Sequence, residues 1–319
     1  MKILFAGTSE IAVSVLEALA RNFEVAGVLT SMDKPGARSR TPVPSAIKTE
    51  ALRLDLPIIE CDHVRKAERE AARLLGADTL VSFSFGRIFG PMFLNLFSHT
   101  VNIHPSPLPE ARGPSPIQAA ILSGRRKWAV SFQEIALEMD SGRIYDVLNL
   151  ELDGTETADS LTQTIKALAA EKIIDVMNSI RNSDEQEKSP ELKTQEGPAT
   201  YCSLVDKQDG RIDFLQSSVE VHCRIRAMYS WPKAFTTLEG CPIMICGVWG
   251  GYDQLQEELP CSVHPGTIVE IRKGRGMKVA CGDGAIWVTR VQFPTKKEIT
   301  YLDLANQRKN LIGTILGHD

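Results

Sequence analysis

The apolar residues of this 319-residue chain follow two different patterns, and the change between them is the strongest constraint on its fold. Up to about residue 180, short apolar runs alternate with segments whose apolar residues recur at helical spacing. Alternating strands and helices predict a mostly parallel sheet whose faces are covered by helices. After about residue 204, short strands are separated by turn signals such as Glu239-Gly240 and Pro265-Gly266, which is typical of a small β-barrel or sandwich.

The first pattern predicts individual elements. We expect strands over the apolar runs at 2–6, 23–29, 56–59, 79–83, 100–103, 130–135 and 144–152. We expect a first helix that presents Ile11, Val15, Leu16 and Leu19 on one face, and further helices over 46–54, 66–75, 116–122 and 156–180. The second half contains one helical stretch, at 219–228.

Residues 183–198 interrupt this rhythm because they are rich in Asp, Glu, Lys, Gln and Pro and almost lack apolar side chains. A segment with so little apolar content is expected to act as a linker. We therefore predict an α/β domain over residues 1–185, a linker over 186–204 and a β-rich domain over 205–319.

Composition excludes several classes of protein. Hydrophobic residues make up 43% and charged residues 24%, which is the balance of a soluble globular chain rather than a disordered one. The formal charge is −4, from 36 basic and 40 acidic residues, so binding to nucleic acid would require a local basic patch. No apolar run approaches the roughly 18 residues of a membrane span. Seven scattered cysteines without a Cys-x-x-Cys pair favour reduced thiols in the cytoplasm and no zinc site.

The first strand-to-helix turn does not have the glycines of a dinucleotide site. Close approach to a pyrophosphate requires Gly-x-Gly-x-x-Gly, whereas this turn reads Gly7-Thr8-Ser9-Glu10-Ile11-Ala12. Because it has one glycine and an acidic residue where a phosphate would lie, we expect no NAD site.

Three polar residues, in two separate motifs, are candidates for catalysis. Asn102 and His104 are two residues apart at the end of a predicted strand, so their side chains point the same way. An amide donor beside an imidazole suits a developing oxyanion and a proton transfer, although the same pair could simply fix a rigid loop. Asp140, in Asp140-Ser141-Gly142, could orient the imidazole or could belong to an ordinary turn.

Four cations lie close together in the sequence, in the loop after the second strand and at the start of the helix that follows it. They are Lys34, Arg38, Arg40 and Lys48, in a stretch that also contains three prolines. They could bind phosphates, or they could belong to a solvated loop. The remaining histidines show no metal-ligand spacing and are expected at the surface or at helix ends: His63, His99, His222, His264 and His318.

Taken together, these features resemble the methionyl-tRNA formyltransferase family over nearly the whole chain. The motifs that carry the resemblance in the first half are Phe5-Ala6-Gly7-Thr8, Asp33-Lys34-Pro35-Gly36-Ala37-Arg38, Pro44-Ser45-Ala46-Ile47-Lys48, Phe85-Gly86, Asn102-x-His104-x-Ser106-x-Leu108-Pro109, Arg112-Gly113, Pro116-Ile117-Gln118 and Asp140-x-Gly142. Those in the second half are Thr200-Tyr201, Gly210-Arg211-Ile212-Asp213, Ile225-Arg226-Ala227, Trp231-Pro232 and Gly282-Asp283-Gly284.

The resemblance implies a Rossmann-like formyltransferase domain followed by an OB-like, tRNA-binding β-barrel. It implies transfer of a formyl group from 10-formyltetrahydrofolate to the α-amino group of methionine on initiator tRNA, without a metal, by a monomer that has no membrane partner. Matched positions imply catalytic roles for Asn102, His104 and Asp140. The residues implied to line the folate site are Ser106, Pro107, Leu108, Pro109, Phe85, Gly86 and Ile88, and those implied to contact tRNA are Lys34, Arg38, Arg40 and Lys48.

Three other functions share some of these features. Another folate-dependent formyltransferase, acting on glycinamide ribonucleotide or an amino sugar nucleotide, would have the same Asn, His and Asp. A formyltetrahydrofolate hydrolase would replace the amine by water. A non-catalytic RNA-binding protein could use the OB-like domain alone, but it would not need these three side chains.

Overall fold

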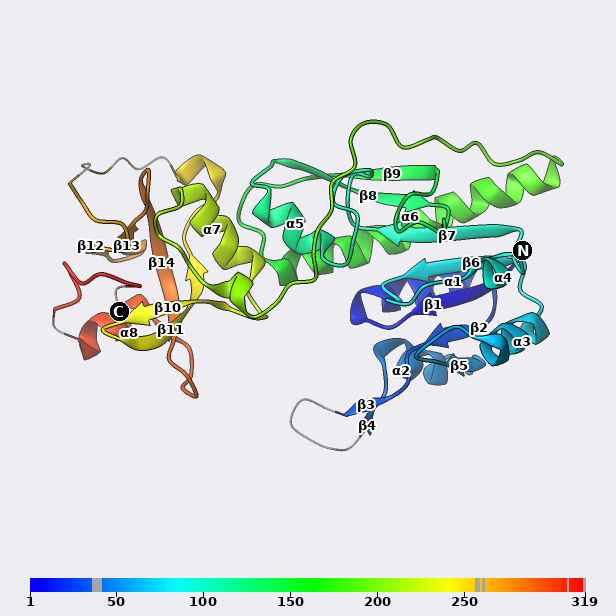
Figure 1. Ribbon diagram of the computed structural model, residues 1–319, viewed down its shortest axis with the longest axis horizontal. Coiled ribbons are helices and arrows are strands. Elements are labelled where there is room, and N and C mark those ends of the chain that lie inside the picture. The colour runs from blue at the N-terminus through cyan, green and yellow to red at the C-terminus, as the bar shows by residue number, and fades with distance from the viewer. Residues whose placement is uncertain (36–41, 256–258, 260–261, 309, 318–319) are drawn as a thin grey trace. The chain divides into compact units, whose positions relative to one another are not determined.

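The computed structural model describes residues 1–35, 42–255, 259, 262–308 and 310–317 (Figure 1). The chain divides into two compact units. The first contains Met1–Pro116, Ala129–Leu150 and Thr162–Cys202. The second contains Ile117–Trp128, Glu151–Leu161 and Ser203–Asp319.

A seven-stranded sheet, counted over the described residues, has the order β5-β2-β1-β6-β7-β8-β9. Its strands are β1 (Lys2–Gly7), β2 (Glu24–Thr30), β5 (Ile58–Glu60), β6 (Thr79–Phe83), β7 (His99–His104), β8 (Lys127–Gln133) and β9 (Ile144–Glu151). The pairs from β5 across to β7 are parallel, and β8 is antiparallel to β7. The predicted, mostly parallel α/β sheet is therefore confirmed, and its carboxyl edge is the expected place for a ligand.

The helices of this half lie close to the predicted ranges. They are η1 (Glu10–Ala12), α1 (Val13–Asn22), α2 (Ala46–Arg53), α3 (Lys66–Leu75), α4 (Pro91–Leu94), α5 (Pro116–Leu122) and α6 (Ala158–Glu185), and β3 (Lys34–Pro35) pairs with β4 (Pro42–Val43) between β2 and α2. The apolar side chains expected on the first helical face are all buried. The pattern missed the one-turn helix α4 and placed β5 two residues too early, because Pro57 delays the start of that strand.

The segment expected to be a linker makes specific contacts with the first unit. Helix α6 continues to Glu185, beyond the predicted end at residue 180. Further on, Ile144 and Lys193 exchange two main-chain hydrogen bonds of 2.7 and 2.9 Å in an antiparallel bridge. The hydroxyl of Thr200 accepts a hydrogen bond from the main-chain N–H of Ala111 (2.9 Å). Polar groups thus attach this segment even though it has few apolar residues.

The second unit is built on an antiparallel sheet, as the turn-rich sequence predicted. Its order, over the described residues, is β10-β11-β14-β13-β12, with β15 paired to β14. The elements are η2 (Gln208–Gly210), α7 (Ser218–Ala227), β10 (Ala234–Leu238), β11 (Cys241–Val248), η3 (Tyr252–Gln254), β12 (Ile268–Arg272), β13 (Gly276–Ala280), β14 (Ala285–Gln292), β15 (Ile299–Thr300) and α8 (Tyr301–Gln307). The named strands form an open path, while Leu316 bridges to Leu238 of β10 and Ile315 to Thr267 beside β12.

His222 of α7 is a correction to the expected surface position, because its side chain is fully buried. Nδ1 accepts a hydrogen bond from Nε of Arg226 (3.0 Å), and Nε2 donates to the main-chain oxygen of Gly250 (3.1 Å). Burial, together with the neighbouring guanidinium, lowers the pKa of His222 to about 3. The ring is therefore neutral and structural.

Two other expectations concern the whole chain. His318 lies outside the described residues. None of the described helices is long and apolar enough to cross a membrane.

Candidate active site

Asn102 and His104 lie at the carboxyl end of strand β7, with their side chains on the same face of the sheet. Asn102 is paired across the strands with Gln133 of β8, and His104 with Ser131. The His104 side chain is buried, and its Nε2 lies 3.0 Å from the main-chain oxygen of Ala111. The Asn102 amide is partly exposed and makes no hydrogen bond to any described residue. The edge of the sheet thus presents a fixed imidazole beside an amide whose donors are available.

The structure brings Asp140 to His104, a contact that the sequence could not establish. Asp140 lies in the turn between β8 and β9, and its Oδ2 is 3.6 Å from Nδ1 of His104. The same Oδ2 accepts a hydrogen bond from the N–H of Gly113 (2.9 Å), while Oδ1 accepts one from Nε2 of Gln133 (3.2 Å). Donors on both oxygens fix the plane of the carboxylate, so that one oxygen faces the imidazole.

The turn that carries Asp140 depends on Gly142 for close packing. A Cβ at position 142 would lie 1.9 Å from the main-chain oxygen of Glu134. Asp140 itself has a φ of 51°, a left-handed conformation that few non-glycine residues adopt. Both features mean that the neighbouring backbone determines the shape of the turn.

We expect Gly142→Ala to displace the Asp140 turn. The added methyl group cannot fit without backbone movement, and overpacking of this kind typically costs about 1–3 kcal/mol. Chemical denaturation should show that loss of stability, and turnover should fall with it. Gly90→Ala is the control, because a Cβ there meets nothing within 4 Å. Equal stability and activity in the two variants would show that the turn tolerates a side chain.

The loop after His104 is held against β8 by two serines. The hydroxyl of Ser131 donates to the main-chain oxygen of Ser106 (2.7 Å) and accepts from the N–H of Leu108 (3.2 Å). The hydroxyl of Ser106 donates to the main-chain oxygen of Glu110 (2.6 Å). Pro107 and Leu108 remain partly exposed at the same edge as Asn102. The segment implied to line a folate site is therefore rigid and close to the catalytic candidates.

The three residues of the second predicted folate segment differ in how exposed they are. Phe85 is buried, and its ring stacks on Phe89 with the centroids 5.2 Å apart. Gly86 has a positive φ of 70°, and the side chain of Ile88 is 82% exposed. The ring of Phe85 thus belongs to the core in this conformation, and Ile88 alone of the three presents its side chain to solvent.

The two predicted cations that the structure describes, Lys34 and Lys48, have different surroundings. The Lys48 ammonium makes hydrogen bonds of 2.8 Å to carboxylates of both Asp33 and Glu60, which raise its pKa. Lys34 is exposed on β3, whereas Arg38 and Arg40 lie outside the described residues. Lys48 is therefore charged and already paired, and only Lys34 is placed as a cation open to solvent.

Three site residues were missed by sequence reasoning. Gln133, Arg112 and Gln195 surround Asp140 and are hydrogen-bonded to one another or to the turn. The position of Gln133 opposite Asn102 follows from strand register, which the sequence does not show. Arg112 stood within a familial motif, but Gln195 gave no signal because it lies in the segment interpreted as a linker. Over the described residues, no group of three or more His, Cys, Asp or Glu could hold a metal.

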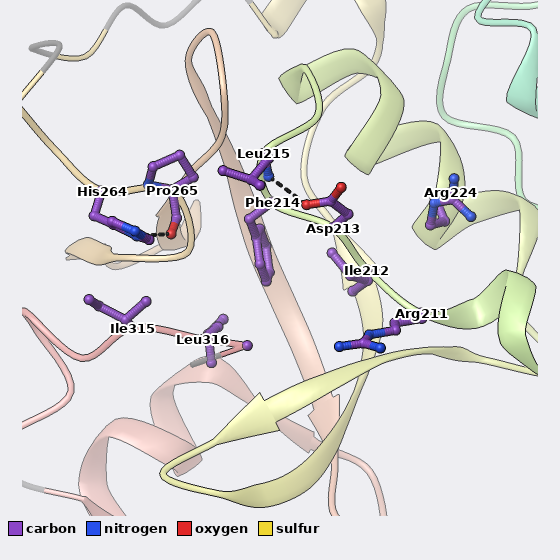
Figure 2. A pocket seen from close by; sticks show the side chains of 11 residues that line it. Arg211, Ile212, Asp213, Phe214, Leu215, Arg224, His264, Pro265, Ile315 and Leu316 are labelled. Atoms are coloured by element: carbon purple, nitrogen blue, oxygen red, sulfur yellow. Dashed lines mark hydrogen bonds between the residues drawn. The ribbon is translucent and has the colours of Figure 1, made fainter. Parts of the chain in front are cut away.

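The second unit has a pocket of its own, with a volume of about 540 Å³ (Figure 2). It combines an apolar wall with two arginines, and its residues are Arg211, Ile212, Asp213, Phe214, Leu215, Arg224, His264, Pro265, Ile315, Leu316 and Gly317. The guanidinium of Arg211 is exposed, and the described residues offer it no hydrogen bond. Arg224 is tied to the main-chain oxygen of Asp209 (2.8 Å).

Comparison with known proteins decides the family. Residues 1–177 match the family description "Formyl transferase", and residues 204–309 match "Formyl transferase, C-terminal domain". A Sorangium cellulosum protein named methionyl-tRNA formyltransferase is 35% identical over 320 residues, which cover 99% of this chain and 100% of that protein. A Sulfurihydrogenibium protein of the same name is 33% identical over 307 residues, which cover 95% and 96% of the two chains. This chain belongs to the methionyl-tRNA formyltransferase family. As a formyltransferase, it is a group-transferring enzyme.

Solved structures share the formyltransferase fold at lower identity. WlaRD, a sugar 3N-formyltransferase crystallised in the presence of dTDP and 5-N-formyl-THF, is 20% identical with a TM-score of 0.65, covering 93% of this chain and 99% of that one. Methionyl-tRNA formyltransferase from Clostridium thermocellum is 20% identical with a TM-score of 0.51, covering 78% and 93% of the two chains. At this level of identity these similarities support the fold alone.

Proposed function

We propose that this formyltransferase transfers the formyl group of 10-formyltetrahydrofolate to the α-amino group of methionyl initiator tRNA, giving formylmethionyl-tRNA for translation initiation. The observation that carries the chemistry is the Asp140–His104 contact beside the open amide of Asn102. The relatives' shared name supports the choice of acceptor.

The proposed catalytic roles follow from charge. When an amine attacks the formyl carbon, negative charge develops on the carbonyl oxygen, and the Asn102 amide can donate to it. Both nitrogens of His104 face acceptors, the Ala111 carbonyl and the Asp140 carboxylate. To donate to the substrate, the Nε2–H group must therefore give up its contact with the Ala111 carbonyl. Asp140 continues to orient the ring through Nδ1. The Asp140–His104 pair then helps to pass a proton from the attacking amine to folate N10, as the bond between N10 and the formyl carbon breaks and tetrahydrofolate leaves.

The remaining assignments concern binding. Ser106 to Pro109, with Phe85, Gly86 and Ile88, line the folate site in this proposal, and Lys34, Arg38, Arg40 and Lys48 face the tRNA. Residues 1–185 form the catalytic domain, 186–204 connect it to the next, and 205–319 form an OB-like domain that binds tRNA. The bridges from Ile315 and Leu316 toward both edges of the C-terminal sheet support the OB-like description.

An acceptor comparison tests this function against its rivals. The purified protein is given 10-formyltetrahydrofolate with methionyl-tRNA, with glycinamide ribonucleotide, with an amino sugar nucleotide, or with water alone. We expect rapid turnover only with methionyl-tRNA. Faster turnover with another amine would make the protein a different formyltransferase, and equal turnover without an acceptor would make it a hydrolase.

We expect Arg38→Ala to lower kcat/KM toward methionyl-tRNA about tenfold or more, because a hydrogen bond to a charged group contributes about 1.5–3 kcal/mol. Folate binding and thermal stability should be unchanged, and the salt dependence of tRNA binding should become shallower. Arg69→Ala, which removes a partly exposed arginine on α3, controls for the loss of one positive charge. If Arg38→Ala and Arg69→Ala have the same kcat/KM and the same salt dependence of tRNA binding, the proposed contact of Arg38 with tRNA is refuted.

A further inference from the structure

The side-chain amide of Gln195 joins four groups of the candidate active site. Its Oε1 accepts a hydrogen bond from Nη2 of Arg112 (2.7 Å). Its Nε2 donates to the main-chain oxygens of Asp140 and Gly142 (2.8 Å each) and lies 3.2 Å from Oε1 of Gln133. Gln195 lies between the two matched family ranges, which end at residue 177 and begin again at 204.

The partners of Gln195 allow only one orientation of its amide. A guanidinium is a donor only, so Arg112 must face the amide oxygen, and main-chain carbonyls are acceptors only, so they must face the NH₂ group. Gln133 is oriented in turn, since its oxygen accepts from Gln195 and its Nε2 donates to Oδ1 of Asp140 (3.2 Å). The hydrogen bonds therefore form a chain in which each group donates to the next, from Arg112 through Gln195 and Gln133 to the Asp140 carboxylate.

The Asp140 turn needs such support. Asp140 has a left-handed φ of 51°, and residues in such regions persist only when the surroundings hold them. Gln195 binds the main chain on both sides of Ser141, at Asp140 and Gly142, and reaches the carboxylate through Gln133. Arg112, which anchors the other end, is only 9% exposed. Its Nη1 contacts Tyr201 (3.5 Å) and Glu138 (3.6 Å), but Gln195 is the described acceptor for Nη2, so losing Gln195 would leave that donor without a partner.

We infer that Gln195 is a positioning residue that holds the Asp140 carboxylate at its working distance from His104. The inference rests on the proposed function of that pair. It also extends the catalytic apparatus into residues 186–202, a stretch that neither family description covers. Gln195 touches no reacting atom in this account and acts through Asp140.

Two substitutions at this position separate positioning from simple packing. Gln195→Ala removes the amide, while Gln195→Glu keeps its length and its acceptor for Arg112 but has no donor for the carbonyls of Asp140 and Gly142. Thr194→Ala is the control, since Thr194 is exposed and has no hydrogen bond to a described residue. We expect both Gln195 variants to lose kcat by about tenfold to a hundredfold, as a displaced catalytic group does, with KM for the folate donor nearly unchanged. Because Gln195→Glu preserves the arginine contact, it keeps the test valid if the alanine variant unfolds.

A double-mutant cycle shows whether Gln195 acts through Asp140. Adding Gln195→Ala to Asp140→Asn should cause little further loss of kcat, because the positioned carboxylate is already absent. Losses that multiply would mean that Gln195 acts independently and would overturn the inference.

Hydrogen exchange tests the same point without activity. The N–H of Gly113 donates to Oδ2 of Asp140, so its protection reports the placement of the carboxylate. We expect faster exchange at Gly113 in both Gln195 variants and wild-type exchange in Thr194→Ala. Unchanged protection would overturn the positioning role, whichever amine the enzyme proves to act on. Loss of protection in an enzyme without methionyl-tRNA activity would refute only the proposed acceptor.

Discussion

Replacing His104 or Asn102 with alanine is expected to lower turnover at least about a hundredfold. Removal of one oxyanion donor typically costs about 2.7–4 kcal/mol of transition-state stabilisation. The Asn102 amide has no hydrogen bond to a described residue, so its loss leaves little unsatisfied in the fold. The His104 ring links Ala111 and Asp140, so its loss also separates the carboxylate from the reaction. Steady-state formylation of methionyl-tRNA measures both effects.

Matched controls come from the same region. His99 begins strand β7 and pairs with Asp184 (2.9 Å), and Asn95 is exposed after α4. We expect His99→Ala and Asn95→Ala to keep near wild-type kcat, and all four variants to bind tRNA with similar affinity. Wild-type turnover in a folded His104→Ala or Asn102→Ala protein would refute the catalytic assignment.

Asp140→Asn is expected to be as severely impaired, even though the two side chains have nearly the same shape. Both carboxylate oxygens accept hydrogen bonds, one from Gly113 and one from Gln133. An asparagine has a single oxygen, so its NH₂ group must face one of these donors or the His104 ring. The variant therefore loses both the charge opposite Nδ1 and a satisfied hydrogen bond, and kcat should fall by about a hundredfold or more.

The control for this substitution is Asp175→Asn, since that carboxylate is 72% exposed and lies 3.7 Å from Lys172. We expect it to be fully active. The folate affinity of Asp140→Asn should stay close to wild type, because the variant changes the reacting end of the site. An active Asp140→Asn enzyme would mean that Asp140 is only a turn residue.

Much of the first unit could be predicted because its elements bury apolar side chains at regular spacing. Helix α3 spans Lys66–Leu75 and strand β6 spans Thr79–Phe83, both as the pattern indicated. The placement of Asn102 and His104 on one face could be predicted as well, since alternate residues of a strand point to the same side. These features depend on residues that are close in sequence, which a periodicity can detect.

The rest of the site depends on contacts that leave no periodic signal. The meeting of Asp140 with His104 follows from the pairing of β7 with β8 and from a left-handed turn. Gln195 holds its place by hydrogen bonds, so its polar surroundings looked like a linker although they are part of the first unit. Lys48 looked unpaired in the sequence because Glu60, one of its two partners, lies beyond helix α2, at the end of strand β5.

The most direct test of the central claim follows the formyl group itself. The enzyme is mixed with 10-formyltetrahydrofolate labelled with carbon-13 in the formyl group and with methionyl initiator tRNA, and the aminoacyl product is analysed by mass spectrometry and NMR after a single turnover. We expect the label to appear on the methionine α-nitrogen at the rate at which tetrahydrofolate is released, and we expect His104→Ala to slow both together. Release of the label as free formate, or its absence from the methionine nitrogen while the folate is consumed, would contradict it.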